Sequence, residues 1–402
     1  MTKSPLLELD GAVQAEGIDA GVAAHYGNPM IEQRSLLAGR ALVDLSHHGV
    51  LGISGPDRLT WLNSIASQEL RSLAVGESTE TLLLDPAGRV EYAIRVLDDG
   101  VQAWLLVEAA ELPGLQAFLD KMKFMLRVQV VDFSLSYATI GSMAVEPTAV
   151  LASVGLDVSS PNGVPLAWRD PWVAVARGGF QYAETPEHPG SSWRWTEMLV
   201  ARSELALLRD NLVAHPVAVP AGLLALEALR IAAWRPRRAR EVDEKTLPHE
   251  LDWLRSAVHL NKGCYRGQET VAKVHNLGHP PRRLVMLHLD GSEGVLPVHG
   301  DDVQADRVVK GAVGTDASEE SSIEPLTERV AIGTITSSAI HYELGPIALA
   351  VIKRTVPATS TLYVSSDGTL ISAAQEVIVP QSAGSVAEIP RLPRLGGRTP
   401  AH

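Results

Sequence analysis

The chain has almost no cysteine: its 402 residues include one, Cys264. A single cysteine excludes an internal disulfide, because a disulfide needs two thiols. It also excludes a zinc or iron–sulfur site built from this chain's own thiolates alone. Since disulfide frameworks belong to oxidising compartments, we expect a cytoplasmic protein.

Long apolar runs and a surplus of basic residues are also missing. No run of about 18 apolar residues is present, which argues against a membrane span, and the first residues lack the apolar core of a signal peptide. The formal net charge of −12 gives no general nucleic-acid footprint, which would be basic. We therefore expect no membrane partner and no specific nucleic-acid partner. The histidines lack ligand spacing with a partner, so we predict no metal site.

What is present is enough for two or three domains with a sizeable core, since 46% of the residues are hydrophobic. The first part of the chain interleaves strand and helix patterns, which predicts an α+β unit. The expected strands are 41–46, 50–54, 81–84, 90–96 and 104–107, and the expected helices are 31–37, a helix starting at 57, and 112–125.

The second half changes pattern along its length. An amphipathic stretch over 223–231 predicts a helix that ends before Pro236. After residue 284, strand-like runs at 284–289, 330–336 and 347–352 predict a small C-terminal β-barrel. The polar, acidic run 315–322 predicts a loop within it, and the Pro-, Gly- and Arg-rich end after about residue 380 predicts a disordered tail.

The cysteine lies in a chemically dense segment, Lys262-Gly263-Cys264-Tyr265-Arg266-Gly267-Gln268-Glu269. The two flanking glycines let the backbone bend sharply and come close to a ligand. A helix expected from Gln268 would place the thiol near a helix N-terminus, where a thiolate is favoured. The alternative is that Cys264 is buried as a small apolar side chain, as most free cysteines are. Both interpretations stay open on the sequence.

A second concentration of charge is the arginine-rich segment 230–240. Guanidinium groups hold carboxylates or phosphates through paired hydrogen bonds, so the segment is a candidate anion site. The alternative is a solvated turn, because Glu241, Asp243 and Glu244 follow and can neutralise the run.

The cysteine segment also carries a family resemblance. Lys-Gly-Cys-Tyr-x-Gly-Gln-Glu resembles the signature of the YgfZ proteins, folate-binding relatives of the glycine-cleavage T-protein (aminomethyltransferase). The resemblance extends over most of the chain, although 140–195 and the tail lack clear matches. Further similar segments are His25-Tyr26-Gly27, Val43–His47, Ser54–Asp57 with Trp61-Leu62-Asn63, Leu229-Arg230-Ile231, Glu241–Glu244, Leu247–Glu250, Gly333–Ser337 and Leu344–Ala350.

The resemblance implies an α+β fold: a three-domain T-protein-like ring around a central channel, with a C-terminal β-barrel. It implies a folate-binding module over 1–283, with an α+β subdomain inserted at about 46–135, then a barrel over 284–379 and a tail over 380–402. The implied ligand is tetrahydrofolate or a derivative. The resemblance implies candidate folate-binding residues, namely Arg230, Glu241, Lys262, Gly263, Tyr265, Gly267, Gln268 and Glu269.

Two departures separate the chain from the T-proteins. The paired aspartates that T-proteins carry after a Gly-Gly turn match Tyr92 and Ala93, and the nearest acid is Glu91, one place early. One place on a strand is the opposite face. The glutamate that anchors the pterin in T-proteins matches Ala232, so Glu227, Glu241 and Asp243 become the candidate acceptors.

These departures favour a folate-binding protein that assists assembly or repair of iron–sulfur clusters in client enzymes. In that hypothesis Cys264 and Lys262 are the candidate reacting residues, and the partners are folate and the iron–sulfur clients or their assembly machinery. The alternative is a folate-dependent aminomethyl or one-carbon transferase that uses Glu91. A third hypothesis is a scaffold whose ligand channel no longer binds. Whether the protein is an enzyme therefore stays open on the sequence.

Overall fold

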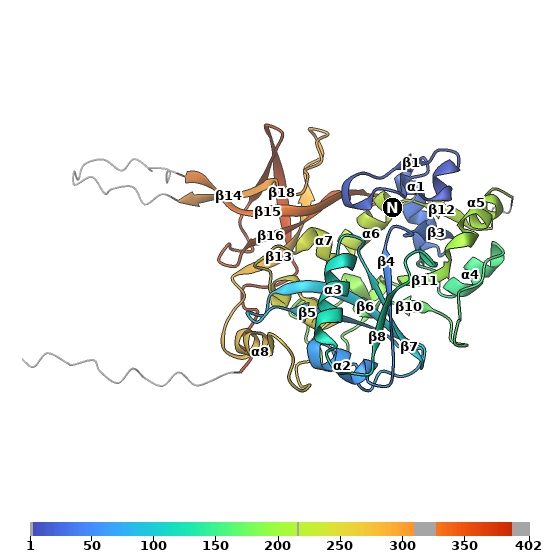
Figure 1. The fold of residues 1–402 in the computed structure, drawn as a ribbon. Coiled ribbons are helices and arrows are strands. Elements are labelled where there is room, and N and C mark those ends of the chain that lie inside the picture. The colour runs from blue at the N-terminus through green and yellow to red at the C-terminus, as the bar shows by residue number, and fades with distance from the viewer. Residues whose placement is uncertain (1–2, 215–216, 309–326, 388–402) are drawn as a thin grey trace, which may run out of the picture.

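A computed structural model describes residues 3–214, 217–308 and 327–387. Within them the chain forms two five-stranded sheets, a two-stranded sheet and a closed barrel. Figure 1 shows the barrel on one side of the molecule and the larger sheets on the other, with helices α6 (Leu223–Ala232) and α7 (Arg238–Glu241) between them. The mixed α and β fold and the C-terminal barrel predicted from the sequence are confirmed.

The first sheet is built from strands that are far apart in the sequence. Its order is β10 (Ala167–Arg169), β11 (Thr196–Ala201), β9 (Tyr137–Ser142), β3 (Ala41–Asp44) and β12 (Val219–Ala221). Helices α1 (Pro29–Leu37), α4 (Pro147–Ser153) and α5 (Leu205–Ala214) lie next to strands of this sheet in the sequence. Strand β1 (Val13–Gln14) pairs with β2 (Ala23–His25). Helix α1 begins where the Asn28 side chain accepts from two backbone N–H groups, and it ends before Gly39, whose φ is +68°.

The second sheet is built from residues 49–132. Its order is β5 (Ser78–Leu84), β6 (Val90–Asp98), β7 (Gln102–Val107), β4 (Gly49–Ser54) and β8 (Gln129–Asp132). Helices α2 (Arg58–Ile65) and α3 (Leu112–Met122) bury apolar side chains with it, including Trp61, Leu105 and Leu115. The predicted hairpin at 81–96 is present as β5–β6, and its turn closes through a hydrogen bond from Gly88 N to Asp85 O.

The barrel closes in the order β13 (Arg282–Leu289), β16 (Gly345–Lys353), β15 (Thr327–His341), β14 (Asp302–Val308), β17 (Leu362–Ser366) and β18 (Thr369–Val377). Its inner face follows the two-residue period of a strand, so that Val285 and Leu287 on β13 are buried together. The acidic run 315–322 lies outside the described residues.

The ordered chain extends past the boundary predicted at residue 380. The backbone N–H groups of Val386 and Ala387 donate to His275 and Asn276 near the end of α8 (Gln268–Leu277). These bonds place 380–387 against the protein, which corrects the predicted tail, and 388–402 lies outside the described residues. Among the helices that the structure describes, none is both long and apolar enough to cross a bilayer.

Candidate functional site

A cavity lies where residues of the two large sheets meet α6, and its empty space is about 670 Å3 when counted to its open mouth. Its lining includes Ala93 and Arg95 of β6, and Leu226 and Glu227 of α6. Four tryptophans also line it: Trp168, Trp193, Trp195 and Trp253. Because indole rings present large flat apolar faces, the cavity is suited to a flat ring.

One wall of the cavity is held rigidly by hydrogen bonds. The rings of Trp193 and Trp195 stack with centroids 5.9 Å apart. Trp193 Nε1 donates to Asp170 Oδ2 at 2.8 Å, and Trp195 Nε1 donates to Glu197 Oε1 at 3.1 Å. Gly141 on the neighbouring β9 makes room for this wall, since a Cβ there would lie 2.2 Å from the ring of Trp195.

The Glu197 carboxylate contributes a negative charge to this wall. Arg95 Nη1 donates to Glu197 Oε2 at 3.0 Å and lies 3.3 Å from Nδ1 of His48. Burial and the nearby His47 and Arg95 hold the pKa of His48 well below its usual value. His48 is therefore neutral at pH 7 and can accept from Arg95, which leaves the arginine charge to Glu197.

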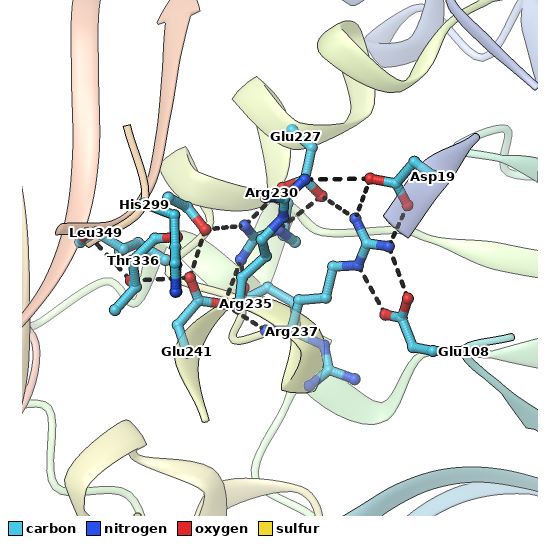
Figure 2. A network of polar contacts seen from close by, with 12 residues as sticks. Asp19, Glu108, Glu227, Arg230, Arg235, Arg237, Glu241, His299, Thr336 and Leu349 are labelled. Carbon is cyan, nitrogen blue, oxygen red and sulfur yellow. Dashed lines mark hydrogen bonds and ion pairs between the residues drawn. The ribbon is translucent and has the colours of Figure 1, made fainter. Parts of the chain in front are cut away.

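A buried ion-pair network borders the cavity (Figure 2). Arg237 donates through Nε and Nη2 to both oxygens of Glu108 at 2.7 Å, and it also reaches Asp19 at 2.5 Å and Glu227 at 3.4 Å. Burial alone would raise the pKa of Glu108, but the Arg237 charge holds that pKa well below its ordinary range. The network therefore stays ionised at neutral pH.

Arg230, a candidate folate-binding residue, has all its donors bound within the protein. Its guanidinium donates to both oxygens of Glu227, to Glu241 Oε2, to Arg235 O and to Ser337 Oγ. An arginine side chain has five N–H groups, and each has a partner here. Arg230 lines the cavity but holds α6 to the barrel.

Glu241, a predicted pterin acceptor, is also fully used within the protein. Its Oε2 accepts from Arg230 and from the backbone N–H of Arg237, and its Oε1 accepts from Thr336 and Ser337 on β15. A carboxylate has about four lone-pair positions, so none is left for a ligand. The folate-binding role of Glu241 stays a prediction, which would require one of these bonds to break.

Lys262 is likewise committed to the protein. It is 7% exposed, and its ammonium donates to the backbone carbonyls of Asn63 at 2.7 Å, Ala66 at 2.6 Å and Gln68 at 2.7 Å. Burial lowers the pKa of Lys262 to about 8. The three donors of the ammonium bind carbonyls at and just after the end of α2, and the reactive or folate-binding role stays a prediction.

We expect Lys262→Met to lower the free energy of unfolding by about 2–4 kcal/mol, because three carbonyls lose a charged donor. The methionine keeps most of the apolar stem, so packing changes little. Urea denaturation of the variant and the wild type measures the difference. A change below about 0.5 kcal/mol would contradict the capping role.

The rest of the signature forms a loop beside the β5–β6 turn. Gly263, Cys264 and Glu269 are exposed, while Tyr265 is buried with its ring 5.3 Å from the Lys262 ammonium. The prediction that Cys264 is a buried apolar side chain is therefore wrong, and its exposed alternative holds.

Two further signature residues position the loop itself. Gln268 Nε2 donates to the Lys262 carbonyl at 3.2 Å. Gly267 has a φ of +85° and precedes α8. The structure thus brings the signature residues together. Among the described lining residues of the cavity, however, only Arg230 comes from the candidate folate-binding residues and only Glu227 from the candidate acceptors.

Sequence reasoning missed the residues that build the cavity wall. Trp193 and Trp195 lie just before β11 and Glu197 lies on it, so the three follow one another at a spacing of two residues. Tryptophan is rare enough that two of them spaced by two, followed by an acid at the same spacing, is a usable signal. The signal lies at the edge of the segment 140–195, where the family resemblance gave no matches.

The buried acid Asp252 makes the free energy of unfolding depend on pH. It is fully buried, its Oδ1 accepts from Tyr182 N, and within the described residues its Oδ2 has no hydrogen-bond partner. Burial raises the pKa of Asp252 to about 7. Unfolding then releases a proton between pH 4 and 7, so this group destabilises the fold as the pH rises through that window.

We expect Asp252→Asn to remove that dependence, because the amide keeps the acceptor for Tyr182 and cannot ionise. The stability of the variant relative to the wild type should rise from pH 4 to pH 8 by on the order of 4 kcal/mol, because folding raises the pKa of Asp252 from 3.8 to about 7. Urea denaturation across this pH range measures it. Parallel pH profiles for the two proteins would refute the assignment.

No protein-family model matches the chain. It is 25% identical over 269 residues to a chloroplastic protein of Arabidopsis thaliana named as a transferase, a match that covers 62% of this chain and 56% of that protein. It is 24% identical over 279 residues to the mitochondrial iron–sulfur cluster assembly factor IBA57 homolog of Mycosarcoma maydis, covering 65% and 60%. It is 26% identical over 369 residues to the aminomethyltransferase of Symbiobacterium thermophilum, covering 86% and 92%.

Among solved structures, the glycine cleavage system aminomethyltransferase T of Bartonella henselae shares the fold. The TM-score is 0.69 at 18% identity, and the superposition covers 95% of each chain. The fold predicted from the family resemblance is therefore confirmed. The sequence similarities and the shared fold support the chain's place in the superfamily of the glycine cleavage aminomethyltransferases.

Proposed function

We propose that the protein binds tetrahydrofolate or a derivative in the tryptophan-lined cavity. The observation that carries the proposal is the wall formed by Trp193, Trp195 and Glu197. A pterin is a flat ring with N–H and amino groups on one edge, so it needs flat apolar faces and an acceptor. Each oxygen of Glu197 has one protein partner, which leaves lone pairs for those groups.

We further propose that the folate-bound protein assists assembly or repair of iron–sulfur clusters in client enzymes, as a YgfZ-type protein of the cytoplasm. The name of the Mycosarcoma maydis relative supports this role, and the aminomethyltransferase relatives support the folate ligand. The exposed face of the signature loop, with Cys264 and Glu269, is the part of the predicted site that is accessible to a client.

The alternative, a one-carbon transferase, needs an acid beside the reacting carbon. Its candidate, Glu91, pairs with Arg266 at 2.8 Å, and both line an outer groove. The neighbouring Ala93 lines the cavity, but Glu91 is not among the described residues that do. The geometry thus favours a folate-binding assistant over a transferase that uses Glu91.

Titration of the protein with tetrahydrofolate, followed by tryptophan fluorescence and calorimetry, tests the ligand. We expect binding in the wild type and about a 10- to 100-fold weaker binding in Glu197→Gln, because a charged acceptor becomes a neutral one. The control is Glu293→Gln, an exposed acid in a turn of the barrel domain, which should bind normally. Absence of binding at millimolar ligand would overturn the proposal.

The cellular role needs a second measurement. In a strain that lacks the protein, iron–sulfur enzyme activities should be restored by the wild type and by Glu293→Gln. Restoration by Glu197→Gln to the same level would show that folate binding is not the working property.

A further inference from the structure

Three N–H donors of cavity-lining residues have no hydrogen-bond partner within the described residues: Nη1 of Arg235, Nε1 of Trp253 and Nε of Arg238. Nε of Arg238 still lies 2.9 Å from Glu111 in an ion pair, which leaves Arg235 and Trp253. Arg235 is 5% exposed and Trp253 is 1% exposed. A buried N–H without an acceptor lowers stability, because the same group donates to water in the unfolded chain. Since both residues line the cavity, a ligand there can supply the missing acceptor.

The Arg235 guanidinium cannot turn to satisfy Nη1 elsewhere. Its Nε donates to Asp170 Oδ2 at 2.9 Å, and its Nη2 donates to Glu80 Oε1 at 2.6 Å. Both acids are themselves fixed, because Asp170 accepts from Trp193 and Glu80 accepts from Ser256. Two carboxylates therefore fix the guanidinium, and its Nη1 remains without an acceptor within the described residues.

Trp253 differs from the other cavity tryptophans in the same respect. Trp168 donates to Thr79 O at 2.7 Å, and Trp193 and Trp195 donate to acids. Among the four, Trp253 is the one whose indole N–H is left without a partner in the described part of the chain. Three satisfied indoles beside one unsatisfied indole point to a specific ligand contact.

We infer that Arg235 and Trp253 together recognise a carbonyl oxygen on the ring of the bound ligand, which for a pterin is the oxygen at position 4. The inference rests on the proposed function. It assigns a ring-edge specificity: the cavity offers N–H donors to the oxo group, whereas Glu197 offers acceptors to ring N–H groups. A ligand with an amino group in place of the oxygen would bring N–H donors against the N–H donors of Arg235 and Trp253. A site with unpaired polar groups of this kind binds such an analogue much more weakly.

Folic acid and aminopterin are a matched pair of probes, because they differ by oxo against amino at position 4. Calorimetric titration of the full-length protein should show at least a ~10-fold preference for folic acid. Trp253→Phe keeps an aromatic ring and removes the N–H, so the preference should fall by about 3- to 10-fold. Trp61→Phe is the control: within the described residues its N–H also has no partner, but Trp61 does not line the cavity, so the variant should keep the wild-type preference.

The outcomes separate the two proposals. Equal binding of both probes by the wild type, unchanged in Trp253→Phe, would overturn the ring-edge assignment and leave folate binding standing. A preference that Trp61→Phe weakens as much as Trp253→Phe would also overturn it. Failure to bind either probe or tetrahydrofolate would overturn the proposed function, and this inference with it.

Discussion

Arg237→Met is expected to lower the free energy of unfolding by about 3–5 kcal/mol, the usual cost of removing one partner from a buried ion pair. The side chain is 10% exposed and neutralises Glu108 and Asp19, with Glu227 nearby. Methionine fills much of the same space, but it leaves Glu108 buried without its paired arginine and Asp19 with the longer contact to Arg240. Urea denaturation at pH 7 measures the loss.

The matched control is Arg240→Met in the same segment. The Arg240 side chain is 32% exposed and touches Asp19 at 3.3 Å, so its loss should cost less than about 1 kcal/mol. If Arg237→Met proved as mild as Arg240→Met, the ionised network would not be stabilising the fold. Low pH offers a second check, since protonating the acids should narrow the gap between Arg237→Met and the wild type.

Gly267→Ala is expected to destabilise the protein by about 2–5 kcal/mol. The residue has a φ of +85°, which costs a side-chain residue about 1–2 kcal/mol. A Cβ would also lie 2.7 Å from Asp85 O and 3.0 Å from the Cα of Gly88, and such overpacking costs about 1–3 kcal/mol. Thermal and urea unfolding should both show the change.

Gly263→Ala, four residues earlier in the same loop, is the control. A Cβ there meets no atom within 4 Å, and its φ is not in the left-handed region, so we expect a change within about 0.5 kcal/mol. Equal effects at the two glycines would show that the loop is not pressed against the β5–β6 turn. The sequence predicted both glycines as ligand-approach positions, but Gly267 instead approaches the protein's own backbone.

Much of the fold was predictable because the signals are local. Strand and helix periods, the Asp85–Gly88 turn and the switch to strand patterns after 284 each lie within a short stretch of sequence. The structure places β5, β6 and the barrel where those patterns predicted them. The family resemblance supplied how these elements are arranged, which local patterns do not contain.

The site was harder to predict because its contacts are long-range. The sequence shows that Lys262 and Arg230 are cationic, but not that their partners are Asn63, Ala66 and Gln68 in one case and Ser337 in the other. The sequence does not show whether a charged side chain is available to a ligand, because the groups that bind it in the fold are distant in the chain. Conversely, the unpartnered donor of Arg235 becomes visible only once its other nitrogens are seen to be used.

The ion-pair network also sets the order in which the protein can assemble. Arg237 meets Asp19 from 218 residues away and Glu108 from 129 residues away, and through Glu227 it joins Arg230, which reaches Ser337 on the barrel. Contacts so distant in sequence form late, because their loop-closure entropy must be overcome first. The parts of the chain therefore become fully stable only together, and a piece cut at residue 283 would retain a buried arginine that has lost its Ser337 contact.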